Sequence, residues 1–357
     1  MESIRTRSFA RAGLLGNPSD GYFGKTLSFT FTQFGVELVM TESSRIRFQQ
    51  GEVDDATFAS LDEMSRNLRL YGYYGGIRLL KATAKRFFDY CQEKGLKLPK
   101  RNFSVEYKIN IPRLVGLSGS SAICSAMLKA LMRFYEVGIP LELQPTLCLE
   151  AERDELGINC GFQDRVIQIY NGLVFMDFEK SFVESHNRGK YEQLYPSSTF
   201  NLQPSTFNLY IAYDANRAEE SGKAHKKVKR LFEEKNADVL AAMSEFADIA
   251  QKGRDAIAAG RTDELPKLVN ANFDLRDKIF NVAEENRRMV MTARQCGASA
   301  KFAGSGGAIV GTYADEAQFE RLKADLAAIG TEVLIPTIAT AADETAEIAG
   351  FGNWRNS

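Results

Sequence analysis

The spacing of apolar and polar residues divides the chain into short strands and amphipathic helices. Residues 103–111 alternate apolar and polar side chains, which predicts a strand, whereas residues 76–94 place apolar side chains at helical intervals. Strands and helices alternate irregularly, without a repeating βαβ unit, so the pattern favours an α+β fold over a doubly wound parallel sheet. The same criteria predict further strands at 207–213, 300–303, 308–313 and 332–335, and further helices at 55–70, 122–135, 141–155, 219–235, 237–259, 263–281, 284–296 and 315–328.

Turn-forming residues mark one local turn and one longer break. Residues 36–40 and 45–48 are short, rich in β-formers and separated by polar residues, so we expect them to pair as a hairpin. Residues 181–206 are polar and contain two Pro-Ser pairs, which makes them the best candidate for a domain boundary. A chain of 357 residues is long enough for about two domains. We therefore expect an N-terminal domain at 1–200, a C-terminal domain at 201–340 and a loose tail at 341–357.

Overall composition restricts the classes of partner. The chain carries 45 Lys and Arg against 46 Asp and Glu, for a formal net charge of −1, which argues against a nucleic-acid binder that neutralises many phosphates. It does not exclude a small anionic ligand, because a few local cations suffice for that. No window is apolar and long enough for a signal peptide or a membrane span, so we expect no membrane partner.

The number and spacing of the histidines and cysteines argue against a role for them in the chemistry. The two histidines, His186 and His225, are too few for a multi-histidine zinc site. The five cysteines are far apart and form no C-x-x-C pair, which indicates a reduced, cytoplasmic setting. The chemistry must therefore rest on carboxylates, Lys and Arg side chains, hydroxyls and backbone groups.

Two glycine-rich segments are candidates for ligand contact. Residues 112–122 follow a predicted strand and precede a predicted helix, so backbone N–H groups and the positive end of the helix converge there. Taken alone, this segment is equally well a serine-capped helix after a tight turn. Residues 301–310 read as two short strands joined by four small residues, which fits a plain hairpin or a close approach to a ligand.

An acidic pair, Glu152 and Asp164, lies between these segments. Glu152 is on the predicted helix 141–155, and Asp164 follows Gly161 at the start of the next helix. Surface carboxylates are common, so either residue alone has an ordinary structural interpretation. Asp164 beside Gly161 and Gln163 is better placed for function than most carboxylates.

Together these segments resemble the motifs of the GHMP kinases, the family of galactokinase, homoserine kinase, mevalonate kinase and phosphomevalonate kinase. Residues 11–20 (RAGLLGNPSD) resemble the first motif, residues 112–122 the ATP-phosphate loop, and residues 304–308 the third motif. Glu152 and Asp164 fall at the spacing of the family's Mg-binding Glu and catalytic Asp. Within the family the resemblance is strongest to the plant-type glucuronokinases, on residues 10–20, 72–80, 116–123, 161–166 and 301–308.

The resemblance implies a fold and a reaction. The fold is an α+β N-terminal domain and a ferredoxin-like C-terminal domain, with the active site between them. The reaction is transfer of a phosphoryl group from ATP to the anomeric hydroxyl of D-glucuronate, giving glucuronate 1-phosphate and ADP. Another small-molecule kinase of the family, for arabinose, galactose or a heptose phosphate, is an alternative, as is a catalytically inactive member that binds a sugar or nucleotide. No oligomeric state is implied.

The resemblance also implies roles for individual residues. Asp164 accepts the proton of the anomeric hydroxyl, and Arg11 pairs with Asp164, which should keep that carboxylate ionised at neutral pH. Ser120 and Glu152 hold Mg²⁺. The implied ATP-binding residues are Pro112, Gly116, Leu117, Ser118, Gly119, Ser120, Ser121, Ala122, Gly304 and Ser305. The implied substrate-binding residues are Asn17, Asp20, Gly161, Gln163, Gly304 and Gly306.

Two departures from the family pattern bear on these roles. Asn17 stands where the galactokinase motif has a glutamate, and the loss of a carboxylate there suits an anionic sugar. Gly119 stands where many members have serine, and counting from Pro112 favours Ser120 over Ser121 as the Mg-facing hydroxyl. The cationic partner of the sugar carboxylate stays open among Arg113, Arg165, Arg217 and Lys223.

Overall fold

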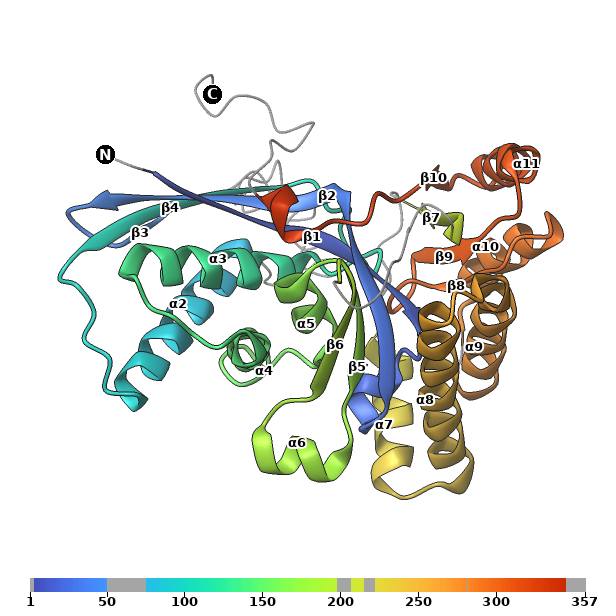
Figure 1. Cartoon of the computed structure of the whole chain (residues 1–357), viewed down its shortest axis with the longest axis horizontal. Coiled ribbons are helices and arrows are strands. Elements are labelled where there is room, and N and C mark those ends of the chain that lie inside the picture. Colours follow the sequence, from blue (N-terminus) through green and yellow to red (C-terminus); the bar gives the residue numbers. More distant parts are fainter. Residues whose placement is uncertain (1–2, 50–74, 198–206, 215–221, 281, 345–357) are drawn as a thin grey trace, which may run out of the picture.

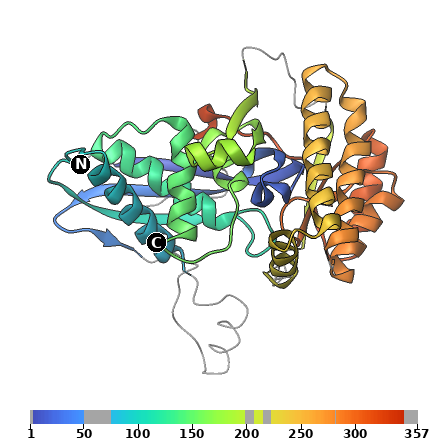
Figure 2. The same ribbon diagram turned by 90° about the horizontal axis from the view of Figure 1, so that it is seen from below.

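The computed structural model describes residues 3–49, 75–197, 207–214, 222–280 and 282–344. The predicted helix 55–70 lies outside these ranges, as do Arg217 and residues 345–357 of the predicted tail. The two halves of the chain lie side by side along the long axis of the molecule (Figures 1 and 2). None of the helices in the described ranges has the length and the apolar run needed to cross a bilayer.

A mixed sheet forms the framework of the first half. Within the described ranges it has six strands in the order β3-β4-β2-β5-β6, with β1 paired to β2. The 19-residue β2 is its centre, because β1 pairs with β2 along most of its length while β5 and β4 share its other edge. The strands are β1 (Ile4–Leu15), β2 (Lys25–Ser43), β3 (Arg47–Phe48), β4 (Asn102–Ile109), β5 (Leu173–Asp177) and β6 (Lys190–Tyr195).

Helices cover one face of this sheet (Figure 1). Helix α3 is apolar over most of its length and packs against β1 and β2, with Ile123, Met127 and Leu131 almost fully buried. Short 3-10 turns occur at η1 (Ser19–Tyr22) and η3 (Leu141–Leu143). The helices of this half are α2 (Gly76–Glu93), α3 (Gly119–Tyr135), α4 (Gln144–Arg153), α5 (Gln163–Tyr170) and α6 (Lys180–His186).

The second half is an antiparallel sheet covered by helices. Its described strands have the order β10-β7-β9-β8. They are β7 (Leu209–Tyr213), β8 (Lys301–Phe302), β9 (Ala308–Thr312) and β10 (Glu332–Leu334). The helices are α7 (Gly222–Glu233), α8 (Ala237–Ala258), α9 (Leu265–Ile279), α10 (Glu284–Gln295) and α11 (Glu316–Ala327), with 3-10 turns at η5 (Thr262–Glu264) and η6 (Ala341–Glu344).

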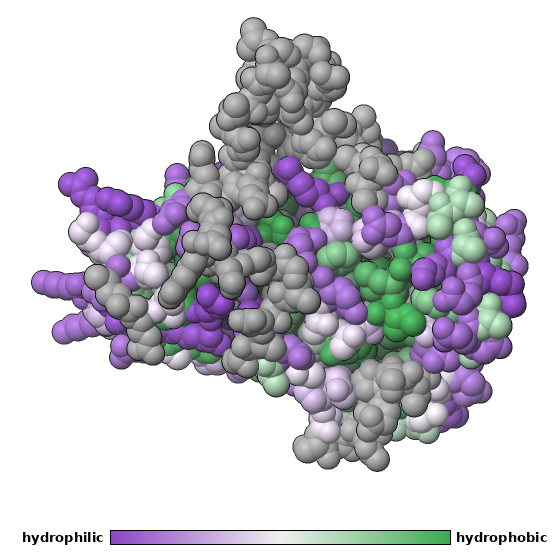
Figure 3. Space-filling model, turned by 90° about the horizontal axis from the view of Figure 1, so that it is seen from above, coloured by the Kyte–Doolittle hydropathy of each residue, from purple (hydrophilic) through white to green (hydrophobic). Residues whose placement is uncertain are grey.

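The two halves share a hydrophobic core at their junction. Helix α8 packs on β2, and Ile249 and Ala250 of α8 belong to the same buried cluster as Leu15 and Leu27 of the first sheet. Apolar side chains lie largely inside the molecule: the face in Figure 3 is mainly hydrophilic, with a patch of apolar residues over the second half. The junction of the halves is therefore a packed interface.

The end of the described chain returns to the first half. Ile338 forms a β-bridge with Phe31, and the Ala339 N–H donates to the Thr30 carbonyl at 2.9 Å. Glu344 accepts a hydrogen bond from Asn171 Nδ2 at 2.6 Å and forms an ion pair with Lys129. Residues 337–344 thus run along the first sheet after the second half is complete.

Most of the predicted elements occur in the structure, but the predicted hairpin at 36–48 is wrong. Over residues 36–40, β2 already has β1 on one edge and β4 on the other. No edge is left for a returning partner, so β3 lies instead on the outer edge of β4, in parallel. Local turn propensity gave no information about which edges of the strand would be occupied.

Candidate active site

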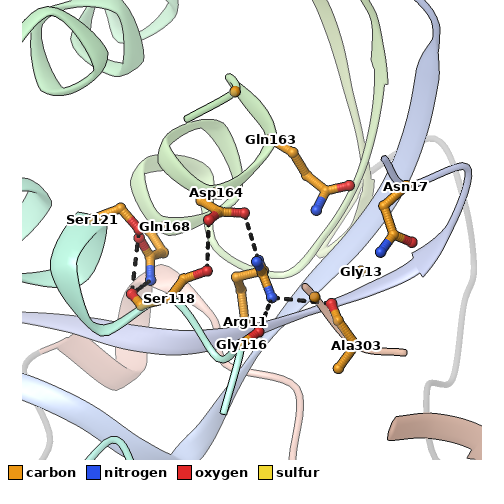
Figure 4. A network of polar contacts seen from close by, with 12 residues as sticks. Arg11, Gly13, Asn17, Gly116, Ser118, Ser121, Gln163, Asp164, Gln168 and Ala303 are labelled. Carbon is orange, nitrogen blue, oxygen red and sulfur yellow. Dashed lines mark hydrogen bonds and ion pairs between the residues drawn. The ribbon is translucent and has the colours of Figure 1, made fainter. Parts of the chain in front are cut away.

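Arg11 joins the two glycine-rich loops to the acidic helix. From the second half of β1 its Nη1 donates to the Gly116 carbonyl at 2.6 Å and to the Ala303 carbonyl at 3.0 Å, and its Nε donates to Asp164 Oδ1 at 2.6 Å (Figure 4). The side chain is almost fully buried. One guanidinium therefore fixes three segments that lie 105 to 292 positions away in the sequence.

The two glycine-rich loops touch each other beside Arg11. A Cβ atom on Gly304 would lie 2.1 Å from the Gly116 carbonyl oxygen and 2.9 Å from Arg11 Nη1. Real Cβ atoms do not approach this closely, so glycine at 304 is required by the contact itself. The structure thus brings the ATP-loop candidates of 112–122 against the third motif.

Asp164 is an ionised carboxylate in the first turn of α5. Its Oδ2 accepts a hydrogen bond from Ser118 Oγ at 2.7 Å, and Arg165 Nη1 lies 3.7 Å away. Burial alone would raise the pKa of Asp164, but the charges of Arg11 and Arg165 and the hydrogen bonds from Arg11 and Ser118 outweigh it and lower the pKa to about 2. The expected ionisation at neutral pH follows.

Ser118 holds an unusual backbone conformation at the start of α3. Its φ of 65° is in the left-handed region, which costs a residue other than glycine about 1 kcal/mol. The Ser118 carbonyl is fixed by Gln168 Nε2 at 2.9 Å and by the Ala122 N–H at 3.2 Å. Gln168, a buried residue of α5, had no signal in the sequence because both of its acceptors, Ser118 and Phe9, are backbone carbonyls.

Glu152 and Arg165 form a buried ion pair behind Asp164. Arg165 Nε donates to Glu152 Oε2 at 2.6 Å, and Arg165 Nη1 donates to the Gly161 carbonyl at 2.9 Å. Burial lowers the pKa of Arg165, but the Glu152 carboxylate outweighs it and raises that pKa above its usual value. The guanidinium of Arg165 is therefore already paired within the protein, which removes Arg165 from the four candidates for binding the sugar carboxylate.

The donor set fits a magnesium ion. Glu152 Oε1 is fully buried and has no hydrogen-bond partner among the described residues, a costly state for a carboxylate oxygen unless a cation meets it. Ser121 is buried and its hydroxyl donates to the Ser118 carbonyl at 3.2 Å, whereas Ser120 is half-buried and its hydroxyl makes no hydrogen bond within the described ranges. The same ranges hold no cluster of three or more His, Cys, Asp or Glu side chains, so phosphate oxygens would supply the other ligands.

Asp20 is a second carboxylate of different character. Its Oδ2 accepts from the Gln163 N–H at 3.2 Å, and a Cβ on Gly161 would lie 2.1 Å from that oxygen, so only glycine permits the approach. Burial and the Asp164 charge raise the pKa of Asp20 to about 6, against the opposing effects of the Gln163 N–H, Arg11 and Arg165. The pKa values of the two neighbouring carboxylates, Asp20 and Asp164, therefore differ widely.

Asn17 is oriented by a buried lysine. Lys301 Nζ donates to Asn17 Oδ1 and the Gly13 carbonyl at 2.5 Å each, and to the Phe302 carbonyl at 2.7 Å. An ammonium group only donates, so the Asn17 oxygen faces Lys301, and Asn17 Nδ2 donates to the Phe302 carbonyl at 3.5 Å. Burial, then the charges of Arg276 and Arg11, lower the pKa of Lys301 well below its usual value. The side chain of Gln163 extends from α5 toward Asn17 (Figure 4), and its Oε1 is buried without a partner in the described part of the chain.

Most of the candidate residues predicted from the sequence thus meet at one place. Arg113 is exposed at the start of the ATP-loop segment, while Arg217 and the side chain of Lys223 lie outside the described residues. Lys301 and Arg276 were missed as site-building residues. A lysine inside an otherwise apolar short strand was the one available signal for Lys301.

Comparison with known proteins gives three consistent findings. The family model for the GHMP kinases N terminal domain matches residues 78–172. The chain is 44% identical over 311 residues to probable glucuronokinase 2 of Arabidopsis thaliana, covering 85% of this chain and 82% of that protein. It is 41% identical over 314 residues to glucuronokinase 1 of the same plant, covering 86% and 84%.

A solved structure agrees at the level of the fold. Galactokinase of Lactococcus lactis in complex with galactose matches with a TM-score of 0.72 at 15% identity, covering 95% of this chain and 94% of that one. The likeness confirms the predicted α+β, two-domain fold class.

Proposed function

Since this chain belongs to the GHMP kinase family, and within it to the glucuronokinases, we propose that it transfers the γ-phosphoryl group of ATP to the anomeric hydroxyl of D-glucuronate. The products are glucuronate 1-phosphate and ADP. The observation that carries the proposal is the Asp164 carboxylate, held by Arg11 and Ser118 where two glycine-rich loops meet. A cytoplasmic location is part of the proposal, supported by five cysteines that all lie in the described ranges and form no disulfide.

The ATP phosphates lie against the two glycine-rich loops. Backbone N–H groups and the N-terminus of α3 offer donors and partial positive charge to phosphate oxygens. Residues proposed to contact ATP are Pro112, Gly116, Leu117, Ser118, Gly119, Ser120, Ser121, Ala122, Gly304 and Ser305.

Asp164 orients the attacking hydroxyl and receives its proton. As the new oxygen–phosphorus bond forms and the bond to ADP breaks, the proton of the anomeric hydroxyl passes to Asp164 and then to solvent. A carboxylate with a pKa near 2 is a weak base, so its larger contribution is positioning, which dominates phosphoryl transfer. Arg11 holds Asp164 in place and offsets the charge that develops nearby.

Glu152 and Ser120 are the residues that would hold Mg²⁺, which when bound neutralises charge on the ATP phosphates. Replacing Glu152 by Gln removes the charge that faces the ion, and the Mg²⁺ concentration for half-maximal activity should rise about tenfold or more. The matched control is Glu150→Gln, two residues away on the same helix and paired with Arg86. An unchanged Mg²⁺ requirement in Glu152→Gln would remove Glu152 from the metal site.

The sugar acid lies beside Asp164, against the turn after β1 and the start of α5. Asn17 Nδ2 makes one long hydrogen bond, to the Phe302 carbonyl at 3.5 Å, and we assign its second N–H to the substrate. An amide donor suits a carboxylate better than the glutamate of the galactokinase motif does. Asp20 accepts a hydrogen bond from a sugar hydroxyl. The proposed contact residues are Asn17, Asp20, Gly161, Gln163, Gly304 and Gly306, and a cation for the sugar carboxylate is proposed among Arg113, Arg217 and Lys223.

A substrate panel tests the proposal. The full chain is incubated with MgATP and D-glucuronate, D-galacturonate, D-galactose, L-arabinose or a heptose 7-phosphate, and ADP release is followed. NMR of the product then assigns the phosphorylated oxygen. ADP release with glucuronate and phosphorus on O1 supports the proposal. Turnover of a neutral sugar but not of glucuronate overturns the substrate, and nucleotide binding without ADP release from any sugar overturns the kinase activity.

A further inference from the structure

Arg276 of α9 holds the second glycine-rich loop, that of residues 301–310. Its Nη1 donates to the Gly304 carbonyl at 3.0 Å and its Nη2 to the Ser305 carbonyl at 2.9 Å. The two prongs of one planar guanidinium thus meet two successive carbonyls. No other side chain can form this contact in the same way, because only arginine carries paired donors in a rigid fork.

The guanidinium is itself held in place by its surroundings. It is about 4% exposed and lies over the rings of Phe280 and Phe302, with centroid distances of 5.2 and 5.1 Å. Two aromatic faces restrict the fork to one plane and favour its charge. Arg276 is therefore a rigid support for the loop.

Peptide geometry converts this support into the direction of two donors. In a trans peptide the carbonyl of one residue and the N–H of the next point to opposite sides. Both peptides are trans, so carbonyls of Gly304 and Ser305 that face Arg276 turn the N–H groups of Ser305 and Gly306 away from it. Their nitrogens lie beside the ATP loop, 3.1 and 3.4 Å from where a Cβ of Gly116 would be.

These two N–H groups have no acceptor among the described residues. The neighbouring N–H groups do: the Ala303 N–H donates to the Ala308 carbonyl at 2.9 Å, and the Gly307 N–H to Asn286 Oδ1 at 3.2 Å. Gly306 is buried and Ser305 is half-buried. Buried backbone donors are rarely left without an acceptor, and two adjacent N–H groups at a turn can form an anion site.

We infer that Arg276 is a positioning residue for phosphoryl transfer. It orients the N–H groups of Ser305 and Gly306 toward the phosphoryl group that is being transferred. The inference rests on the proposed kinase activity. Arg276 touches neither substrate; it acts through two peptide planes. Donors fixed before the reaction stabilise charge as it develops without having to reorganise, so their loss should fall on kcat.

The test compares Arg276→Lys and Arg276→Gln with the wild type. Lysine keeps the charge but loses the fork, and glutamine loses both. In each variant we expect kcat to fall about 10²-fold, with the KM of the sugar changed much less. The complex of ADP with aluminium fluoride and Mg²⁺ mimics the phosphoryl group during transfer. The affinity of the variants for this complex should fall in parallel with kcat, whereas their affinity for ADP alone should stay unchanged.

Arg294→Lys is the matched control. Arg294 also donates to a backbone carbonyl, that of Asn270 at 2.9 Å, and lies over an aromatic ring, but it contacts neither glycine-rich loop. Arg294→Lys should lower the unfolding temperature about as much as Arg276→Lys does, and it should leave kcat within about threefold of the wild-type value. If Arg276→Lys keeps the wild-type kcat, or if both lysine variants lose kcat equally, the inference is wrong.

A measurement on the wild-type chain covers the case in which the Arg276 variants do not fold. With ¹⁵N-labelled glycine and serine, the amide signals of Ser305 and Gly306 should shift when ADP and aluminium fluoride bind. Unchanged signals would overturn the inference. Because this readout needs no sugar turnover, it separates a failure of the inference from a failure of the proposed substrate.

Discussion

Four buried basic side chains lie at the site, and the two from each half of the chain differ in what they contact. In the first half, Arg11 and Arg165 pair with the carboxylates of Asp164 and Glu152. In the second half, Lys301 donates to two carbonyls and an amide oxygen, and Arg276 contacts two loop carbonyls. Pairing with a carboxylate sets the charge of a reacting group, whereas contacts to carbonyls set the path of the backbone. Arg11 does both, because its Nη1 also donates to the Gly116 and Ala303 carbonyls, whereas the contacts of Lys301 and Arg276 described above serve positioning.

Replacing Asp164 by Asn should have the largest effect. The amide cannot accept the proton of the attacking hydroxyl and no longer forms an ion pair with Arg11, so kcat should fall about 10³-fold. Steady-state ADP release measures kcat, and circular dichroism checks that the fold is retained. Near-normal turnover would show that Asp164 and its ion pair with Arg11 do not carry the chemistry.

Replacing Lys301 by Met should act mainly on stability. It leaves the Asn17 and Gly13 oxygens buried without a donor, which should lower the free energy of unfolding by about 2–4 kcal/mol. Urea unfolding measures the loss. Because Asn17 also loses its fixed orientation, the KM of the sugar should rise while kcat falls less than in Asp164→Asn.

An outcome in the opposite sense would break the comparison. If Lys301→Met unfolds at the wild-type urea concentration, the carbonyl contacts of the second half do not support the backbone. If its kcat falls as far as that of Asp164→Asn, positioning and chemistry are not separable at this site.

The smallest expected effect is a pH dependence due to Asp20. Its pKa is raised in the folded chain to about 6, so the folded state holds the proton more tightly than the unfolded state. That contribution to stability is complete below about pH 4 and is lost as the pH rises through 6, a fall of about 1 kcal/mol between pH 5 and 8. Asp164, whose pKa is lowered to about 2, has the opposite pH dependence: its contribution to stability is complete above about pH 4 and is lost as the pH falls through 2.

Asp20→Asn isolates this contribution. Urea unfolding of the variant and the wild type at several pH values between 5 and 8 should give a difference in stability that changes by about 1 kcal/mol across the range. Parallel curves would mean that Asp20 has an ordinary pKa in the folded chain.

The sequence predicted one group of cations far better than the other. Arg11 and Asp164 stand in recognisable motifs, and a cation near a carboxylate is a pairing that residue types suggest. Lys301 and Arg276 contact mostly backbone carbonyls, which every residue carries, so no pattern of residue types marks their partners. Gln168, which fixes Ser118, was invisible for the same reason.

The fold shows a similar division. Helices such as α8 and α9 follow from local periodicity, because each buries one face of its own residues. The hairpin at 36–48 failed because the edges of β2 are taken by β1 and β4, which is settled by contacts distant in the sequence. Local patterns thus specify elements well and their neighbours poorly.

The return of residues 337–344 to the first sheet has a consequence for how the molecule is made. Gln33 and Ile335 are 302 positions apart yet share a hydrogen bond, and Ile338 meets Phe31 nearby. A ribosome that has produced only the first half has not yet made the segment that lies against β2. We expect stalled nascent chains ending before residue 330 to leave that edge open to protease, and chains that extend past residue 344 to protect it.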